Sequence, residues 1–465
     1  MSHALAVAAV LAAGCATAPP PQDPEAAVAR LLRERIAAAG DTAPVAGTLP
    51  AALRRFYSAR AWRPAWSRNR AVELVAAVAA APADGLRPAD YPLDSIRALL
   101  DRPAPGPADL AALDLLLSGT FLLYAEHVSS GRFTPWSVET MWSAAPAALD
   151  LAAALTLATD SGPVAAVLRG LAPPHAGYER LRAQLTRVSG ERARQIEANL
   201  ERWRWLPRDL GPRYIMVDIP AFTLEVIDSG RTAQTARVIV GRPDWPTPIT
   251  TAPVTQIVFN PSWYIPRAIA LAELIPAQIR DSAYLSRMGI RVFTARGGRE
   301  IDPRTVEWRQ VTERNYAYRL IQDPGPANPL GAVRLLVVNP FGVTLHDTPQ
   351  RELFTHPVRV SSHGCVRVER ALELAKFLLR NVPEWTPDTI AAVLRAGRER
   401  SAVLPRALPV VFAYWTAWVD DQGVLQFRDD VYGWDARLAS ALAPPRVASV
   451  SSARTSASSV CENSP

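Results

Sequence analysis

Apolar residues recur at helical spacing through the first part of the chain. In residues 25–39 they lie on one helical face, formed by Val28, Leu31, Leu32 and Ile36. Comparable patterns follow in residues 71–81, 109–128 and 191–205. Turns rich in proline and glycine separate them. We therefore expect a mainly helical domain over residues 25–205.

The most apolar of these segments, residues 110–128, could be mistaken for a membrane span. It contains Asp114, Glu126 and the pair Ser118-Gly119. Polar and ionisable groups are costly in the core of a bilayer. We expect a buried helix in the core of the helical domain instead.

The hydrophobic period changes from helical to alternating at Arg213. Short runs rich in β-branched residues and bounded by turns predict strands. They occupy residues 214–219, 222–228, 235–240, 254–259, 333–338 and 342–345. Residues 261–330 interrupt these strands with helical and irregular sequence, and a helix is expected at about 369–379. The pattern indicates a β-rich domain with an inserted subdomain.

Two segments follow the β-rich domain. Residues 409–418 and 424–427 have strand character, and residues 421–423 between them predict a hairpin turn. The last residues, 441–465, are rich in serine and are expected to be disordered.

The composition is that of a globular protein with several domains. The chain has 465 residues, of which 49% are hydrophobic and 20% charged. The formal net charge is +7. The basic residues are scattered, without a stripe or interleaved aromatic side chains, so nucleic-acid binding is not expected. A basic protein could still act on an anionic polymer.

The first residues have the features of an export signal. Residues 4–13 form an apolar run that ends in small residues and is too short to span a bilayer. Residues 11–15 are similar to a lipoprotein box, whose cysteine, here Cys15, receives the lipid. We expect a signal segment over residues 1–15, a proline-rich tether over 16–24, and a periplasmic protein anchored to the outer membrane by lipid. Plain secretion and a cytosolic location are the alternatives.

One cysteine lies in a segment suited to catalysis. Cys365 stands beside Gly364 in the polar run of residues 361–367, which argues against simple burial. His346 precedes it by nineteen residues. In thiol acyl transfer an imidazole accepts the proton and the sulfur attacks. Cys365 and His346 are therefore the candidate nucleophile and base, with His363 as a second candidate base.

The other cysteines, Cys15 and Cys461, fall in the signal segment and in the tail. A single ordered cysteine in an exported protein favours a reactive thiol over a structural disulfide. The sequence has no Cys-x-x-Cys or His-Glu-x-x-His spacing, so no metal site is expected.

Several motifs occur in an order that resembles a known family. His346 and the run Ser-His-Gly-Cys-Val-Arg at residues 362–367 resemble the signature of L,D-transpeptidases with a YkuD-like catalytic domain. Three more segments are similar to the long, Gram-negative-type branch of that family. They are Val-Gly-Arg-Pro with Thr-Pro at residues 240–248, Asn-Pro-Ser-Trp-Tyr-Ile-Pro at 260–266, and Gln-Asp-Pro-Gly-Pro at 322–326 with Leu-Gly at 330–331.

The resemblance implies an α+β multidomain fold. Residues 25–205 would be a helical scaffold domain, and residues 213–385 a β-sandwich catalytic domain. Residues 261–330 would form a subdomain that caps the site, and residues 386–440 a C-terminal extension with the hairpin. The peptidoglycan-binding module that many long members carry is expected to be absent, because one predicted helix near 182–199 occupies its interval.

The resemblance also implies roles for the motif residues. Cys365 would be the nucleophile and His346 the base. His363 and Gly364 would shape the pocket, with backbone N–H groups forming an oxyanion hole. Asp347 could orient His346, or a backbone carbonyl could do so.

Four further residues are candidates for binding substrate. Arg367 suits a substrate carboxylate, with a structural ion pair as the alternative. Ser362 lies in the same motif. Trp263 and Tyr264 could line the cleft or pack inside the inserted segment.

The implied activity is peptidoglycan cross-linking without a cofactor. Cys365 would attack the diaminopimelate carbonyl of one stem peptide, release the terminal D-Ala, and pass the acyl group to an amine of a second stem, giving a 3→3 cross-link. Stem peptides would be donor and acceptor, and β-lactams, carbapenems above all, would acylate the thiol. Other cell-wall synthases are candidate partners. The protein would contact the membrane only through its lipid anchor.

The acceptor is left open by the sequence. Water as acceptor would make the protein an L,D-carboxypeptidase, and a lipoprotein substrate would make it an enzyme that attaches or releases wall-bound lipoproteins. A non-catalytic wall-binding lipoprotein is the alternative from another class.

Overall fold

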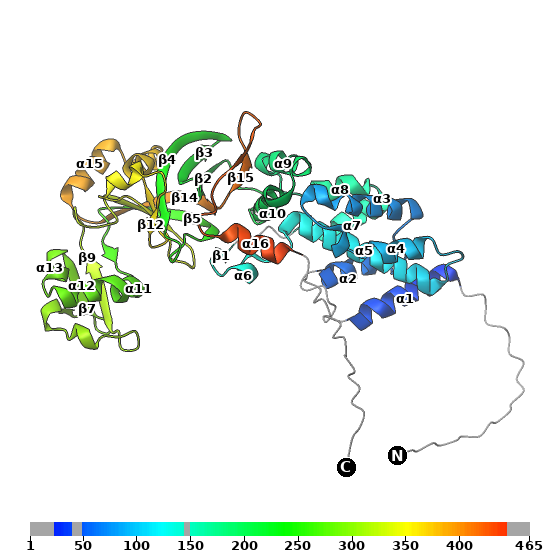
Figure 1. Cartoon of the computed structure of the whole chain (residues 1–465), viewed down its shortest axis with the longest axis horizontal. Coiled ribbons are helices and arrows are strands. Elements are labelled where there is room, and N and C mark those ends of the chain that lie inside the picture. The colour runs from blue at the N-terminus through cyan, green and yellow to red at the C-terminus, as the bar shows by residue number, and fades with distance from the viewer. Residues whose placement is uncertain (1–22, 40–48, 144–148, 444–465) are drawn as a thin grey trace, which may run out of the picture.

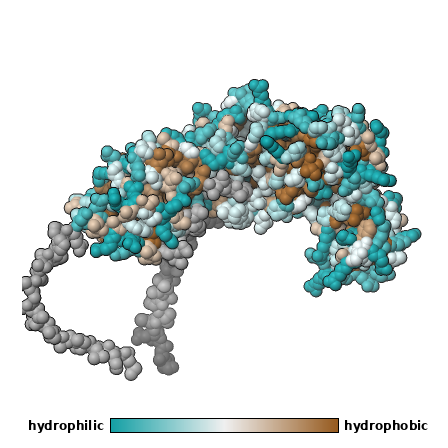
Figure 2. All heavy atoms as spheres, turned by 180° about the vertical axis from the view of Figure 1, so that it is seen from behind, coloured by the Kyte–Doolittle hydropathy of each residue, from teal (hydrophilic) through white to brown (hydrophobic). Residues whose placement is uncertain are grey.

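The computed structural model describes residues 23–39, 49–143 and 149–443. The molecule is elongated, with a helical domain at one end and a β-rich domain in the middle (Figure 1). A small subdomain lies beside the β-rich domain at the end furthest from the helical domain. Seen from behind, hydrophobic residues gather in patches among hydrophilic ones over both large domains (Figure 2). The predicted signal segment 1–15, with Cys15, and residues 444–465 of the tail predicted at 441–465, with Cys461, lie outside the described residues. The tail was predicted to begin too early, because residues 441 and 442 belong to a helix that ends at Leu442.

The helical domain runs from the first described helix to the start of the β-rich domain. Its helices are α1 (Pro24–Ala39), α2 (Leu49–Ala59), α3 (Arg68–Ala79), α4 (Leu93–Leu100), α5 (Pro107–Ser130), α6 (Pro135–Val138), α7 (Leu151–Asp160), α8 (Val164–Gly170), α9 (Ala176–Arg182) and α10 (Gly190–Arg204). The predicted stripe of α1 contributes Val28, Leu32 and Ile36 to one shared core. Helices α1, α3, α5 and α10 overlap the four segments with a helical pattern.

Helix α5 is the centre of this domain. Of the described helices it is the one long and apolar enough to cross a membrane, a test that core helices of soluble proteins also pass. It packs against α1, α2, α3, α4, α7 and α8. Its Asp114 is buried and accepts hydrogen bonds from the backbone N–H of Trp66 at 3.0 Å and from the Tyr57 hydroxyl at 2.5 Å. A buried carboxylate with these partners belongs to a protein core.

The β-rich domain contains strands β1 (Trp142–Ser143), β2 (Arg213–Asp218), β3 (Thr223–Asp228), β4 (Arg231–Gly241), β5 (Ile249–Phe259), β10 (Val333–Val337), β11 (Leu345–His346), β12 (Val360–Ser362), β13 (Val366–Val368) and β14 (Arg400–Ala413). Helices α14 (Ala371–Leu379) and α15 (Pro387–Ala396) contribute to its core. The strands pair in the order β5-β10-β11-β13-β4-β3-β2-β14, and β14 pairs again with β5. The sheet therefore closes on itself around an apolar core instead of forming the two separate layers of the predicted sandwich.

The predicted extension over residues 386–440 is in part a piece of this sheet. Its segment β14 pairs with β2 in parallel and with β5 in antiparallel orientation. The hairpin is shorter than predicted and consists of β15 (Ala417–Val419) and β16 (Leu425–Phe427). Helix α16 (Trp434–Leu442) follows it. Residues 409–413 were expected in the hairpin and lie in the main sheet instead.

The inserted subdomain has its own sheet and its own core. It contains β6 (Trp263–Tyr264), α11 (Arg267–Ile269), a π-helical turn η5 (Ala270–Leu274), α12 (Ile275–Arg280), α13 (Tyr284–Arg287), β7 (Ile290–Thr294), β8 (Glu300–Ile301) and β9 (Tyr318–Gln322). The strands pair in the order β6-β9-β7-β8 and share a buried apolar cluster with the helices. The sequence predicted helical and irregular structure here and missed this sheet. Its strands have only two to five residues each, which is too short for a clear alternating pattern.

Candidate active site

Cys365 lies in a tight turn between two short strands. We call residues 362–366 the nucleophile turn; they join β12 to β13. Gly364 has a φ of +96°, a conformation that a residue with a Cβ rarely adopts. The Ser362 side chain is buried, donates to the Cys365 carbonyl, and accepts from the Gly364 N–H at 3.2 Å. Ser362 is thus engaged inside the turn, which differs from its predicted contact with substrate.

The sheet register places the candidate base beside the nucleophile. Strands β11 and β13 are parallel, with His346 opposite Arg367. The Val366 N–H donates to the Thr344 carbonyl at 2.9 Å, so Cys365 lies beside Thr344 at the start of this pairing. Because alternate residues of a strand share a face, the side chains at 365 and 367 lie on the same face as His346.

A backbone carbonyl orients the imidazole of His346. Its Nδ1 lies 2.6 Å from the carbonyl oxygen of Asp347. A carbonyl only accepts hydrogen bonds, so Nδ1 carries the proton and Nε2 keeps its electron pair. Burial, with the positive charges of Arg367 and Arg334, lowers the pKa of His346 to about 3. The ring is therefore neutral at neutral pH and can accept a proton.

The thiol of Cys365 is protonated in the resting protein. Burial raises the pKa of Cys365, and the Thr344 N–H and the charges of Arg334 and Arg367 offset this only in part. The residue itself is partly exposed. A neutral thiol and a neutral imidazole therefore lie on the same face of the sheet.

The carboxylate of Asp347 shapes a neighbouring turn and does not orient the imidazole. It accepts a hydrogen bond from the Ala332 N–H at 2.9 Å and lies 3.3 Å from the guanidinium of Arg351. A Cβ at Gly331 would lie 2.5 Å from its Oδ2, so only glycine fits there. Of the two predicted ways of orienting His346, the structure has the backbone carbonyl.

Two arginines flank His346 on the same face of the sheet. Arg334 of β10 is opposite His346 on one side, and Arg367 of β13 on the other. Arg367 donates to Gln350 Oε1 at 2.8 Å, and the Nε of Arg334 lies 3.4 Å from Thr344 Oγ1. Within residues 23–39, 49–143 and 149–443 no ion pair of either arginine is found. The structural ion pair predicted as the alternative for Arg367 is therefore absent from the described part.

Sequence reasoning missed Arg334. It lies in a predicted strand, but its importance depends on which strand is its neighbour, and that is not written in the local sequence. The one available signal is a charged residue inside an otherwise apolar strand.

His363 faces away from this pair and toward the inserted subdomain. Its Nε2 lies 2.6 Å from Glu273 Oε1, an atom of the subdomain, and 3.1 Å from Arg242 Nη1. Trp245 meets its ring edge-on with the centroids 5.1 Å apart. These partners favour His346 over His363 as the base, because His363 is occupied by Glu273.

Trp263 and Tyr264 lie in β6 of the subdomain. Trp263 is partly buried and packs against the subdomain core, which matches the packing alternative. Tyr264 is 63% exposed. In the part of the chain that the structure describes, no group of three or more His, Cys, Asp or Glu side chains could hold a metal ion.

The thiol of Cys365 and the neutral imidazole of His346 lie on one face of the sheet, flanked by two guanidinium groups. Residues 212–390 match the family model of the L,D-transpeptidase catalytic domain (YkuD), and residues 51–185 match that of a scaffold domain. By these matches the chain contains an L,D-transpeptidase catalytic domain of the YkuD type, preceded by a scaffold domain.

The chain is also similar to individual proteins. It is 26% identical over 392 residues to a protein of Haemophilus influenzae whose assignment as an L,D-transpeptidase is itself a prediction; the match covers 83% of this chain and 78% of that protein. The avibactam carbamoyl enzyme of Ldtfm is 12% identical with a TM-score of 0.21, covering 43% of this chain and 49% of that one. An L,D-transpeptidase from Mycobacterium smegmatis is 15% identical with a TM-score of 0.19, covering 43% and 58%. The chain spans about half the length of these two solved structures.

Proposed function

We propose that this protein is a peptidoglycan L,D-transpeptidase that forms 3→3 cross-links through a thioester on Cys365. The observation that carries the proposal is the placement of Cys365 and a buried, neutral His346 on one sheet face inside the matched catalytic domain. The mechanism requires no cofactor, because thiol and imidazole supply both the nucleophile and the proton acceptor.

The first half-reaction acylates the thiol. His346 Nε2 takes the Cys365 proton as sulfur bonds to the carbonyl carbon at the L-centre of diaminopimelate in a tetrapeptide stem. The imidazolium then donates that proton to the nitrogen of the terminal D-Ala, which leaves as the amide bond breaks. A thioester remains on Cys365, and His346 is neutral again.

The second half-reaction releases the thioester to an amine. The side-chain amine of a second stem attacks the thioester carbonyl while His346 takes its proton. Sulfur leaves, regains that proton from the imidazolium, and a 3→3 amide bond has formed.

Backbone N–H groups of the nucleophile turn would stabilise the oxyanion in both half-reactions. The Gly364 N–H already donates to Ser362 Oγ. The N–H groups of His363 and Cys365 are therefore better candidates than that of Gly364.

The two arginines suit the charge of the donor. A tetrapeptide stem carries carboxylates at the terminal D-Ala and at diaminopimelate, both close to the bond that is cleaved. Arg334 and Arg367 flank the catalytic pair and could each bind one of them. Each binding site would then help to place the scissile carbonyl against the sulfur.

The proposal extends to the cellular setting. Cys15 would carry a lipid that holds the protein to the outer membrane in the periplasm, with the tether of residues 16–24 between anchor and helical domain. Stem peptides would be donor and acceptor, and other cell-wall synthases would be partners.

Mass spectrometry of muropeptides tests the activity. Cells that express the protein should gain 3→3 cross-linked dimers, and cells that express Cys365→Ser should lose them, because a serine hydroxyl is a far weaker nucleophile with this base. Cys461→Ser is the matched control, since it removes the other thiol expected in the mature protein. Tripeptides in place of dimers would identify a carboxypeptidase. Cross-linking retained in Cys365→Ser would exclude the thioester mechanism.

A further inference from the structure

A loop far from the catalytic motif in sequence packs against the backbone of the nucleophile turn. We call residues 241–247, which join β4 to β5, the clamp loop. The fully buried hydroxyl of Thr247 accepts from the Gly241 N–H at 2.9 Å and donates to the Gly364 carbonyl at 2.8 Å. Thr247 thus fixes the backbone of the residue directly before Cys365.

The clamp loop follows the nucleophile turn along its length. The Arg242 N–H donates to the Ser362 carbonyl at 2.9 Å. A Cβ at Gly364 would lie 3.4 Å from the Pro246 carbonyl oxygen, so the two backbones are in close contact. The clamp loop is itself tight, because a Cβ at Gly241 would lie 2.1 Å from the Trp245 carbonyl oxygen. A displacement of this loop would therefore move the nucleophile turn.

One tyrosine hydroxyl forms hydrogen bonds with both ends of the clamp loop. Tyr432 lies in the C-terminal segment, nearly two hundred residues beyond the loop. Its hydroxyl donates to the Gly241 carbonyl at 2.6 Å and accepts from the Thr247 N–H at 3.3 Å. It thereby joins the first and last residues of the clamp loop, and both contacts use the same oxygen.

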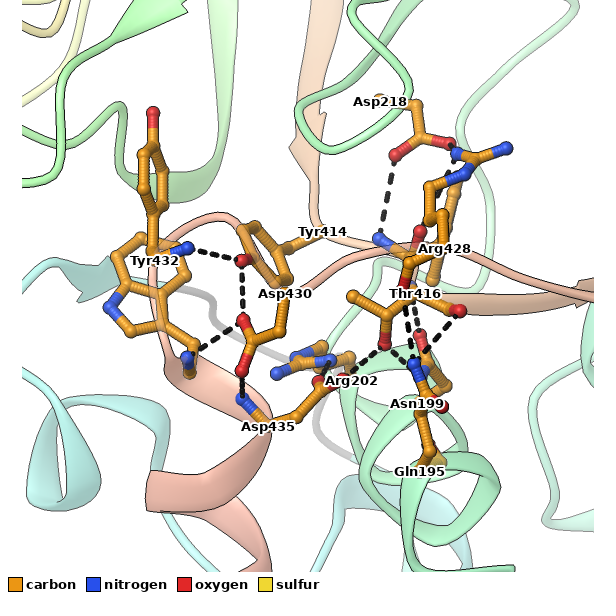
Figure 3. Close-up of polar contacts among 12 residues, drawn as sticks. Gln195, Asn199, Arg202, Asp218, Tyr414, Thr416, Arg428, Asp430, Tyr432 and Asp435 are labelled. Carbon is orange, nitrogen blue, oxygen red and sulfur yellow. Dashed lines mark hydrogen bonds and ion pairs between the residues drawn. The ribbon is translucent and has the colours of Figure 1, made fainter. Parts of the chain in front are cut away.

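The Tyr432 side chain is held by a polar cluster at the joint between the two large domains (Figure 3). Its backbone N–H donates to the Tyr414 hydroxyl at 2.9 Å, and that hydroxyl donates to Asp430 at 2.5 Å. The rings of Tyr414 and Trp434 pack against its ring at centroid distances of 5.6 and 4.8 Å. Figure 3 shows the ring of Tyr432 pointing out of this cluster, away from Asp430 and Asp435.

The same cluster contains residues of the helical domain. Asp430 also accepts from the Asp435 N–H at 2.7 Å. The carboxylate of Asp435 accepts from Thr416 Oγ1 at 2.6 Å and from Arg202 of α10 at 2.6 Å. Asn199 of α10 donates to Thr416 Oγ1 at 2.8 Å. A continuous series of contacts therefore runs from α10 through Tyr432 to the residue before Cys365.

We propose that Tyr432 is a positioning residue for the nucleophile: its hydroxyl fixes the clamp loop, and the clamp loop fixes the nucleophile turn through Thr247. The proposal rests on the proposed role of Cys365. It gives the C-terminal segment a part in catalysis through the clamp loop, to which the Tyr432 hydroxyl is hydrogen-bonded. It also makes the joint with the helical domain a determinant of the geometry at Cys365.

Tyr432→Phe tests the proposal, because it removes the hydroxyl and keeps the ring. Turnover of a tetrapeptide donor and acylation of Cys365 by a carbapenem should both fall about tenfold to a hundredfold, because small misplacements of a reacting group cost this much. The loss should appear in kcat with KM unchanged, since Arg334 and Arg367 are untouched. Thr247→Val should cause a similar loss, and Thr247→Ser, which keeps the hydroxyl, should restore the rate.

A double-mutant cycle separates positioning from general destabilisation. If Tyr432 acts through Thr247, the variant with both Tyr432→Phe and Thr247→Val should be no slower than the slower single variant. Rate losses that multiply would overturn the proposal, as would a Tyr432→Phe enzyme with the wild-type kcat. Thr416→Val is the control: it weakens the joint without touching the clamp loop, so it should lower the melting temperature with a smaller loss of kcat.

Two further measurements keep the outcome unambiguous. If Tyr432→Phe does not fold, Asp430→Asn replaces it in the cycle, because it loosens the segment that carries Tyr432. Cys365→Ser is assayed in parallel. Full turnover by that variant would refute the proposed function, whereas an inactive Cys365→Ser with a fully active Tyr432→Phe would refute the positioning role alone.

Discussion

The two sides of Cys365 are built differently. On the strand side, formed by Arg334, His346 and Arg367, sheet register sets the positions, and His346 is 4% exposed. On the loop side, His363 is held by side-chain contacts to Glu273 and Arg242, both of them partly exposed. Backbone register tolerates little movement, whereas exposed side-chain contacts break at small cost. The strand side is therefore suited to chemistry, and the loop side to a contact that opens and closes.

The two histidines near Cys365 differ in the same way as the two sides of the site. His346 has its tautomer fixed by a carbonyl and its charge suppressed by burial. His363 has Nε2 turned to an acid of the inserted subdomain. A base needs a free electron pair. His346 keeps one on Nε2, because its Nδ1 carries the proton, whereas Nε2 of His363 is turned to Glu273.

The largest expected effect separates these histidines. His346→Ala should lower the rate of Cys365 acylation by about a hundredfold to ten-thousandfold, the range for loss of a general base. His363→Ala should lower it by less than about tenfold, because only a contact to the subdomain is lost. Carbapenem acylation followed by mass spectrometry measures both, with circular dichroism to verify folding. A greater loss in His363→Ala would reverse the assignment of the base.

The second effect concerns stability on the strand side. Unfolded histidine binds a proton below its ordinary pKa of 6.5, whereas folded His346 does so only below about 3. Between these values the unfolded state holds the extra proton, so stability falls as the pH falls. From pH 6.5 to 4.5 this one group should cost about 2 kcal/mol of unfolding free energy.

Chemical denaturation of wild type and His346→Gln at both pH values measures this effect. The variant should show the smaller decline. His127 of the helical domain, whose pKa burial lowers to about 4, is the matched histidine: His127→Gln should also flatten the decline while leaving activity intact. Equal declines in wild type and His346→Gln would show that His346 is not buried in its neutral form.

The sequence was sufficient for the motif and for the type of most elements, because both are local. Cys365 and His346 stand in a recognisable order, and the helical stripe of α1 and the alternating strands β2 and β3 follow the expected periods. The position of β14 was not predictable in this way. Two arginines and Pro405 interrupt its first half, and its pairing with β5 and β2 is set only by closure of the sheet.

The rest of the site depends on contacts between distant segments. Arg334 acquires its place from the register of β10 with β11, and Glu273 from the docking of the subdomain on His363. Tyr432 lies in a segment without periodicity, so nothing near it in the sequence indicates the clamp loop. Such pairings require the fold, since one sequence contains no record of which segments meet.

The third effect concerns the arginines of the strand side. Arg334→Met and Arg367→Met keep much of the side-chain length and remove the charge. If each guanidinium binds a donor carboxylate, each variant should raise KM about tenfold or more, because hydrogen bonds to charged groups contribute about 1.5–3 kcal/mol. Steady-state kinetics with a tetrapeptide donor measures the change. A donor amidated at its carboxylates is the control, since the variants should lose nothing further with it; an undiminished effect on that donor would exclude carboxylate binding.

The smallest effect is expected on the loop side, where the subdomain meets His363. We expect the subdomain to cover the thioester until the amine arrives, because an exposed thioester is lost to water. Shortening residues 268–310 to a linker would test this, but it would remove β7 and β8, leave β9 without its partner β7, and open the subdomain core. Glu273→Gln is cleaner, because it removes the charge that faces His363 and Arg242 and keeps the shape. The ratio of cross-linked product to hydrolysed tripeptide should fall about twofold to fivefold. The effect is small because a partly exposed ion pair contributes little free energy.

The pH dependence of this ratio gives the same contact a second test. Burial raises the pKa of Glu273, but its hydrogen bonds and charge interactions with His363 and Arg242 outweigh this and hold the pKa below its ordinary value. The carboxylate therefore supports the contact at and above its ordinary pKa, and the support is lost as the pH falls through the lowered value. Wild type should approach the product ratio of Glu273→Gln only in that acid range. Glu300→Gln, which breaks an ion pair with Arg291 inside the subdomain, should leave the ratio unchanged at every pH. The same cross-link to tripeptide ratio in wild type and Glu273→Gln would show that the contact with His363 does not protect the thioester.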